Sequence, residues 1–232
     1  MRLTRRRTLA VLAAASSPGL AASPPRRVTT PVLAPLLDGM GDFRAADATP
    51  SARARRYFEQ GMVLAWGFNP QEAARAFEAA SQLAPGCAAC HWGLAWALGP
   101  TINADMAPAD AARVAAALHQ ARRQRQRASA RFAGLIAALS TRHPGPGTAD
   151  IDEETYARRL RALAVRHPDD ADIAVLAAES LLNLHPYDWW QPDGRAWPWT
   201  NEIVAMLSRA LEIAPGHPGA NHYWVHVFER ST

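Results

Sequence analysis

The segment Cys87-Ala-Ala-Cys90-His91 has residue types and spacing that point to chemistry. The C-x-x-C-H pattern attaches c-type haem, through two thioethers and a histidine that ligates the iron. Because the cysteines follow Pro85-Gly86 at the start of an expected helix, a disulfide or redox-labile pair is a second interpretation. Two small side chains that simply pack are the third. The sequence favours the disulfide or redox pair, since a helical repeat fills its interior with Ala, Leu and Phe and leaves little room for haem.

A second candidate site lies in the segment "HPGANHYWVHVFE". His222, His226 and Glu229 stand at positions i, i+4 and i+7, which places three potential ligands on one stripe of a helix. Imidazole and carboxylate groups at this spacing suit Zn²⁺ or Cu²⁺, and Glu179 is an alternative to Glu229 as the third ligand. Trp224, Val225 and Phe228 lie on the other side of this helix and are expected to face the adjoining helices. The competing interpretation is a set of solvated or hydrogen-bonded groove residues without a metal.

Other polar and aromatic side chains fall on the equivalent stripes of earlier expected helices. In a stacked array of helix pairs, these stripes would line one concave groove and could bind a ligand without chemistry. The residues expected there are Trp92, Trp96, Asn103, Glu179, Asn183, Trp189 and Trp190.

The connection "LHPYDWWQPDGRAWPWT", residues 184–200, is unusually aromatic. Its tryptophans could form a lid that stacks on a ligand or on a partner side chain. The alternative is a long connection that its own indoles pin to the scaffold, with Asp188 and Asp193 as turn residues.

These residues must be positioned by helices, because the composition is rich in Ala, Leu and Arg and shows helical spacing from Ser51 onward. The segment from Arg56 to Gly86 carries a tetratricopeptide signature. Small residues at two of its positions should let paired helices approach closely, an aromatic ring should fill the gap, and a proline should end the second helix. The signature residues are Tyr57, Gly61, Leu64, Ala73, Phe77, Ala80 and Pro85.

Further helices follow at 88–98, 107–126, 128–145, 152–170, 171–186, 200–219 and 219–232, which gives about four and a half helix pairs. The sequence therefore predicts an all-α protein, built as a right-handed α-solenoid of tetratricopeptide-like helix pairs. The last pair lacks its second helix, so we expect the repeat domain at 51–232 to be incomplete at its C-terminal end.

The segments from Arg56 to Asn103, from Leu184 to Thr200 and from His217 to Glu229 resemble the N-terminal half of a family of exported bacterial tetratricopeptide proteins. No activity is assigned to that family. The resemblance implies a helical solenoid and carries no catalytic residues. His91 departs from the family pattern, in which an aromatic residue follows the second cysteine, so the haem motif is not a family property.

The N-terminus resembles an export signal. Residues 1–22 combine a basic start with a short apolar run and small residues, and paired arginines leave both twin-arginine and general export open. The net charge is +4, and removal of four arginines with the signal leaves +4 − 4, near zero. A basic surface for nucleic acid is thus not expected. Residues 23–50 are predicted to be a linker or an irregular cover, and no segment is long enough to span a membrane.

The sequence contains none of the nucleotide-binding, hydrolase or metalloprotease motifs that would indicate an enzyme. It therefore favours a periplasmic or secreted binding scaffold whose concave groove takes a peptide, a protein partner or a small ligand. The alternative function is a metal-binding protein centred on His222, His226 and Glu229, or a c-type haem protein centred on Cys87, Cys90 and His91.

Overall fold

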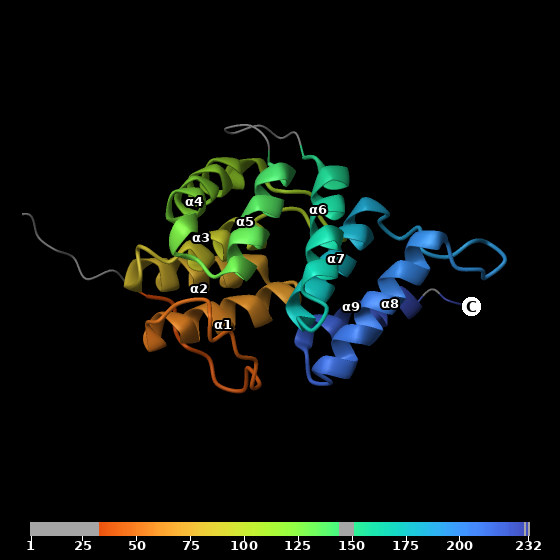
Figure 1. Cartoon of the computed structure of the whole chain (residues 1–232), viewed down its shortest axis with the longest axis horizontal. Coiled ribbons are helices and arrows are strands. Elements are labelled where there is room, and N and C mark those ends of the chain that lie inside the picture. The colour runs from red at the N-terminus through yellow and green to blue at the C-terminus, as the bar shows by residue number, and fades with distance from the viewer. Residues whose placement is uncertain (1–32, 144–150, 230, 232) are drawn as a thin grey trace, which may run out of the picture. The chain divides into compact units, whose positions relative to one another are not determined.

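The computed structural model describes residues 33–143, 151–229 and 231, and it is all-α over these ranges (Figure 1). The predicted signal peptide at 1–22 lies outside the described residues. Two isolated bridges are the only β-type pairings within the described ranges. The α-helices are α1 (Ala52–Trp66), α2 (Pro70–Leu83), α3 (Ala88–Ala97), α4 (Ala111–Gln124), α5 (Ala130–Arg142), α6 (Glu153–Arg166), α7 (Ala171–Leu184), α8 (Pro198–Ile213) and α9 (Pro218–Phe228).

Side chains that the local sequence supplies fix where several helices begin. The hydroxyl of Ser51 accepts a hydrogen bond from the Ala54 amide, and Ser129 caps α5 in the same way. Carboxylates of Asp152 and Asp170 cap α6 and α7. Because the first amides of a helix have no partner within it, these caps define starts that the sequence pattern alone locates to within a residue or two.

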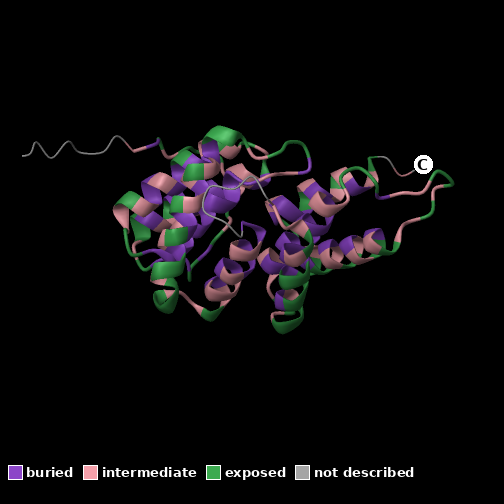
Figure 2. Ribbon diagram, turned by 90° about the horizontal axis from the view of Figure 1, so that it is seen from above, coloured by how far each residue is buried: buried purple, intermediate pink, exposed green. Residues whose placement is uncertain are grey.

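Each α-helix packs against the next one along the chain, and odd-numbered helices also contact one another. The contacts include α1 with α3, α3 with α5 and α7 with α9. Buried residues face the interior of this assembly, whereas exposed residues gather on loops and outward-facing turns (Figure 2). In the part of the chain described, no helix has the length and apolar character needed to cross a bilayer.

The close packing of α1, α2 and α3 depends on two glycines that flank one aromatic ring. A Cβ atom on Gly61 would lie 2.8 Å from ring carbons of Phe77, and one on Gly93 would lie 2.4 Å away. Phe77 is fully buried. The predicted roles of Gly61 and Phe77 are thus confirmed, and Gly93 extends the same contact to the next helix.

The segment 33–50, before α1, contains no helix and packs on the helical body. The side-chain amide of Gln60 accepts a hydrogen bond from the Leu37 amide and donates one to the Pro35 carbonyl. The Ala45 amide donates to Glu59 at 3.0 Å. Of the two interpretations of this segment, the contacts fit the irregular cover.

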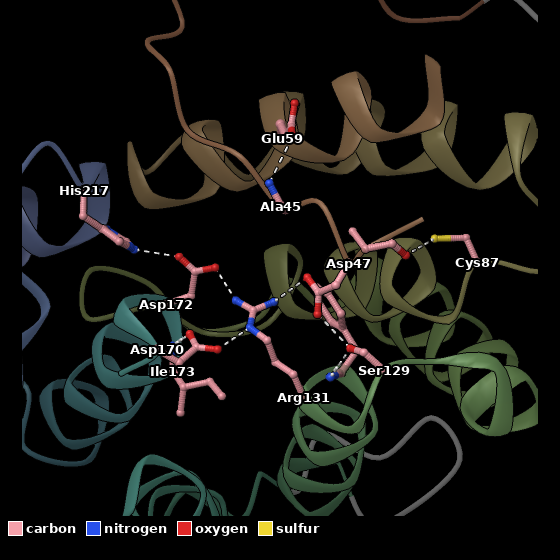
Figure 3. A network of polar contacts seen from close by, with 12 residues as sticks. Ala45, Asp47, Glu59, Cys87, Ser129, Arg131, Asp170, Asp172, Ile173 and His217 are labelled. Carbon is pink, nitrogen blue, oxygen red and sulfur yellow. Dashed lines mark hydrogen bonds and ion pairs between the residues drawn. The ribbon is translucent and has the colours of Figure 1, made fainter. Parts of the chain in front are cut away.

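A network of ion pairs centred on Arg131 joins this cover to α5, α7 and α9 (Figure 3). The guanidinium contacts Asp170 at 2.5 Å and Asp47 at 3.5 Å, and it also pairs with Asp172. His217, at the start of α9, contacts Asp172 at 2.9 Å. Burial alone would lower the pKa of Arg131, but the surrounding carboxylates outweigh burial and raise it. These ion pairs therefore link segments that are distant in sequence.

The last helix, α9, also contacts the first helix, α1. The fully buried Trp66 ring, at the end of α1, lies against Gly219, where an added Cβ would be 2.8 Å from the indole. The same ring has its centroid 4.5 Å from that of His217 and 5.9 Å from that of Trp96. The interior between α1, α3, α7 and α9 is consequently filled by side chains.

We expect Gly93→Ala to lower the free energy of unfolding by about 1–2 kcal/mol. Overpacking against the Phe77 ring costs about 1–3 kcal/mol, and the higher helix propensity of Ala offsets only part of that cost. Urea unfolding measures the change. Gly216→Ala is the control, because nothing lies within 4 Å of a Cβ at Gly216. Equal effects of the two substitutions would contradict the packing argument.

Candidate functional site

The tryptophans expected in the groove of the second repeat lie in the core. The Trp92 and Trp96 rings are stacked with centroids 5.5 Å apart, and the two residues are 1% and 4% exposed. The Trp96 indole nitrogen donates to the Glu179 carboxylate at 3.3 Å. Trp96 of α3 and Glu179 of α7 thus meet as expected, but they meet in a closed interior rather than in an open groove.

Glu179 is a buried carboxylate with an altered proton affinity. Burial raises the pKa of its carboxyl to about 7, and the opposing influence of Arg142 and of hydrogen bonds from Tyr223 and Trp96 compensates only in part. The residue is 4% exposed, so its carboxyl group can be protonated but is not accessible to a substrate. Burial and Glu179 together raise the pKa of the Tyr223 hydroxyl.

The face of α9 that packs inward differs from the expected one. Tyr223 and Val227 are buried against the neighbouring helices, whereas Val225 is 61% exposed. Trp224 is only partly buried. The expectation that Val225 faces the interior is therefore wrong. The reason is that Gly219 and Tyr223 must face Trp66 and Glu179, which fixes the rotation of the helix about its axis.

The predicted metal ligands lie together at the edge of α9. The Nε2 atoms of His222 and His226 are 3.1 Å apart, and the Glu229 carboxylate contacts Nδ1 of His226 at 3.0 Å. Glu179 is directed to Trp96 and Tyr223 and does not join them. Within the described ranges, no group of three or more His, Cys, Asp or Glu side chains is placed to hold a metal ion.

The two cysteines form a disulfide, with their Cα atoms 5.3 Å apart. Cys87 is the N-terminal cap of α3, and its sulfur accepts a hydrogen bond from the Cys90 amide at 3.0 Å. The His91 ring contacts the Pro85 carbonyl at 3.0 Å. This geometry matches the disulfide interpretation. The haem interpretation stays a prediction, and it would require the disulfide to open and the completely buried Cys90 to become accessible.

The aromatic connection at 184–200 is held by its own side chains. The Trp190 indole donates to the Val227 carbonyl at 2.6 Å, and those of Trp197 and Trp199 donate to Asp188. Trp189 is 1% exposed. These contacts fit the interpretation of a pinned connection, because three indole N–H groups are used within the protein and the fourth ring is buried.

Two of the predicted groove residues, Asn103 and Asn183, do line one open pocket, which has a volume of about 670 Å³. The loop from Pro100 to Met106 forms one wall, and the end of α7 forms another. A bridge between Thr101 and Ala104 shapes the loop. The Tyr187 hydroxyl donates to the Asn103 side chain, which ties the loop to the aromatic connection. We refer to this cavity as the Asn183 pocket.

A buried ion pair lies at the wall of the Asn183 pocket. The Arg142 guanidinium is completely buried and contacts the Glu153 carboxylate through Nε at 3.0 Å and Nη2 at 2.6 Å. Nη2 also donates to the Pro100 carbonyl at 2.9 Å, which anchors the start of the loop. The Tyr156 ring lies 4.9 Å from the guanidinium carbon. The pair therefore places Glu153 at the pocket wall with its charge neutralised.

Asn183 is the residue of this pocket with unused hydrogen-bonding groups. Its side-chain nitrogen and oxygen are both buried and have no hydrogen-bond partner among the described residues. An unpaired buried amide costs about 1–3 kcal/mol, a cost that a donor and an acceptor from outside the described residues would remove.

Four residues that shape the Asn183 pocket and the surroundings of Glu179 were not predicted from the sequence: Arg142, Glu153, Tyr187 and Tyr223. Arg142 ends a helix in the segment "STRHPG", where an arginine is typical of a solvated helix end. Glu153 follows a cap residue, where an acid is equally ordinary. Only the spacing of Gly219, Tyr223 and Val227, four residues apart along α9, could have indicated that this tyrosine faces inward.

Comparison with known proteins found no matching family model, no matching curated protein and no matching solved structure.

We expect Glu179→Gln to raise the free energy of unfolding at pH 8 by up to about 3 kcal/mol, and by less than about 1 kcal/mol at pH 5. The folded state binds the Glu179 proton more tightly than the unfolded state, because the carboxyl pKa rises from 4.5 to about 7. Wild-type stability thus falls as the pH rises through this range, and the glutamine variant escapes the penalty.

Urea unfolding of both proteins from pH 5 to pH 8 measures the difference. The two proteins must be compared at each pH, because burial and Arg142 lower the pKa of His143 to about 4. This shift changes the stability of both proteins with pH in the opposite direction, and it cancels in the difference between them. A stability difference that does not change with pH would exclude this role for Glu179.

Proposed function

We propose that this chain is an exported binding protein, a right-handed solenoid of tetratricopeptide-like helix pairs, that holds an extended peptide segment in the Asn183 pocket without covalent chemistry. The contact of each α-helix with the next supports the repeat architecture, and the signal-like residues 1–22 support export. The observation that carries the binding function is the buried Asn183 amide without a partner among the described residues.

A peptide group is the ligand that matches this amide. A side-chain amide offers one acceptor oxygen and two N–H donors in a single plane. The N–H and C=O of one peptide residue can satisfy both sides at once, as neighbouring strands do in a sheet. The pocket volume of about 670 Å³ accommodates several residues of an extended chain.

The charge of the lining favours a neutral or cationic peptide. Asp105 and Glu153 supply carboxylates, and the described lining contains no basic side chain. Because Arg142 already pairs with Glu153, Asp105 is the charge available to a ligand. An acidic peptide would place its carboxylate beside Asp105 without compensation, which is unfavourable at short range.

We expect Asn183→Leu to weaken peptide binding at least tenfold while it raises the free energy of unfolding by about 1 kcal/mol. The substitution removes the buried unpaired amide, which relieves its desolvation cost, and deletes the groups that a peptide would use. Peptides selected from a random phage-displayed library on the wild-type chain serve as probes, and fluorescence anisotropy measures their affinity.

Asn201→Leu is the matched control, because Asn201 is an exposed asparagine on α8, away from the pocket lining. It should leave both affinity and stability within about 0.5 kcal/mol of wild type. Selected peptides that bind Asn183→Leu as tightly as wild type would refute the proposed function, and so would a library that yields no binder.

A further inference from the structure

Two imidazoles on α9 face each other with their Nε2 atoms 3.1 Å apart. His222 and His226 come from successive turns of the same face, so the helix itself sets this approach. Both side chains are partly buried, and the His226 side chain is 16% exposed. The pair lies apart from the Asn183 pocket, whose lining includes neither residue.

The partners of the other ring nitrogens determine where the ring protons are. Nδ1 of His222 contacts the Trp66 carbonyl, which can only accept a hydrogen bond. Nδ1 of His226 contacts the Glu229 carboxylate, which accepts in the same way. Each Nδ1 therefore carries the N–H of its ring, and each Nε2 of a neutral ring presents a lone pair. Two lone pairs that face each other at this distance repel unless a proton or a metal ion lies between them.

The surroundings also favour a cation at this position. The Trp66 carbonyl belongs to the C-terminal end of α1, where the helix dipole is negative. Phe68 lies over both imidazoles, with ring centroids 4.4 Å from His222 and 5.3 Å from His226. Its backbone has a φ of 53°, a left-handed conformation that a bulky residue adopts only under constraint. The end of α1 and the following Phe68 thus lie against the two histidines.

We propose that His222 and His226 bind a divalent transition-metal ion, Zn²⁺ or Cu²⁺, through their Nε2 atoms. With metal–nitrogen bonds of about 2.05 Å, the 3.1 Å separation corresponds to an N–metal–N angle of roughly 100°. This angle lies between the tetrahedral geometry of Zn²⁺ and the square-planar geometry of Cu²⁺, and imidazole suits both ions. Water completes the coordination, so the site is open to an exogenous ligand.

Glu229 has a different role from the one its spacing suggests. Its carboxylate is engaged with Nδ1 of His226, as carboxylates behind metal-bound histidines commonly are. It therefore orients His226 and holds its N–H at Nδ1, while the Trp66 carbonyl does the same for His222. The site is accordingly a two-nitrogen site with Glu229 as a positioning residue, rather than a three-ligand site.

The test is isothermal titration of the untagged full chain with Zn²⁺. Wild type should bind one ion, and His222→Ala and His226→Ala should each lose that binding. His119→Ala, which removes an exposed imidazole on α4, should bind as wild type does. Asn183→Leu should also retain the site, which separates this proposal from peptide binding. Absence of a wild-type site, or equal loss in the His119 control, would overturn the proposal.

Two further measurements do not depend on the folding of the alanine variants. Glu229→Gln should weaken Zn²⁺ binding about 10–100-fold and preserve the stoichiometry of one. Wild type loaded with Cu²⁺ should give an electron paramagnetic resonance spectrum with hyperfine coupling to two imidazole nitrogens. Coupling to no nitrogen, or an affinity that Glu229→Gln leaves unchanged, would rule out the two-nitrogen site with its positioning carboxylate.

Discussion

The burial of Trp66 is the constraint on which the arrangement of the helices depends. This indole ends α1 and is covered by Phe43 of the N-terminal segment, Trp96 of α3 and the start of α9. Burying a side chain of this size contributes several kcal/mol only if all its neighbours are in place. The first helix, the last helix and the irregular cover therefore stabilise one another, which couples segments more than 150 residues apart in sequence.

This coupling explains why polar groups occupy the interior. Because α9 packs on α1, Tyr223 lies against Glu179, and the carboxylate is shielded from water. The hydrogen bonds from Trp96 and Tyr223 satisfy Glu179 but do not restore its hydration. The same packing of α9 on α1 places the Trp66 carbonyl beside His222. The buried contacts of Glu179 and the position of the two histidines therefore depend on the same interface.

The sequence predicted the features that depend on local pattern. Helix positions and the gap filled by Phe77 beside Gly61 follow from spacing within one pair of helices, whereas the convergence of Trp96 with Glu179 was expected from the predicted stacking of helices distant in sequence. The rotation of α9 did not follow, because a shift of one residue turns a helix by about 100° and exchanges Tyr223 for His222 at the interior. Only the neighbours of a helix decide that rotation.

The Asn183 pocket was predictable only in part, for a related reason. Asn183 stands one turn beyond Glu179 on the same stripe of α7, so its location near the groove could be inferred. The pairing of Arg142 with Glu153 joins the end of α5 to the start of α6, and the contact of Arg142 with the Pro100 carbonyl depends on how these helices pack on the preceding part of the chain. The spacing of residues within one helix does not contain that information.

The disulfide between Cys87 and Cys90 closes a ring of four residues within one helical turn. Loop closure over so few residues restricts the unfolded chain by only about 2 kcal/mol, against about 4.7 kcal/mol for a 100-residue loop. The Cys87 sulfur also caps α3, a contact that a free thiol retains. Oxidation of this pair therefore restricts the unfolded chain far less than a bond across a long loop would, and the sulfur cap at the start of α3 does not depend on it.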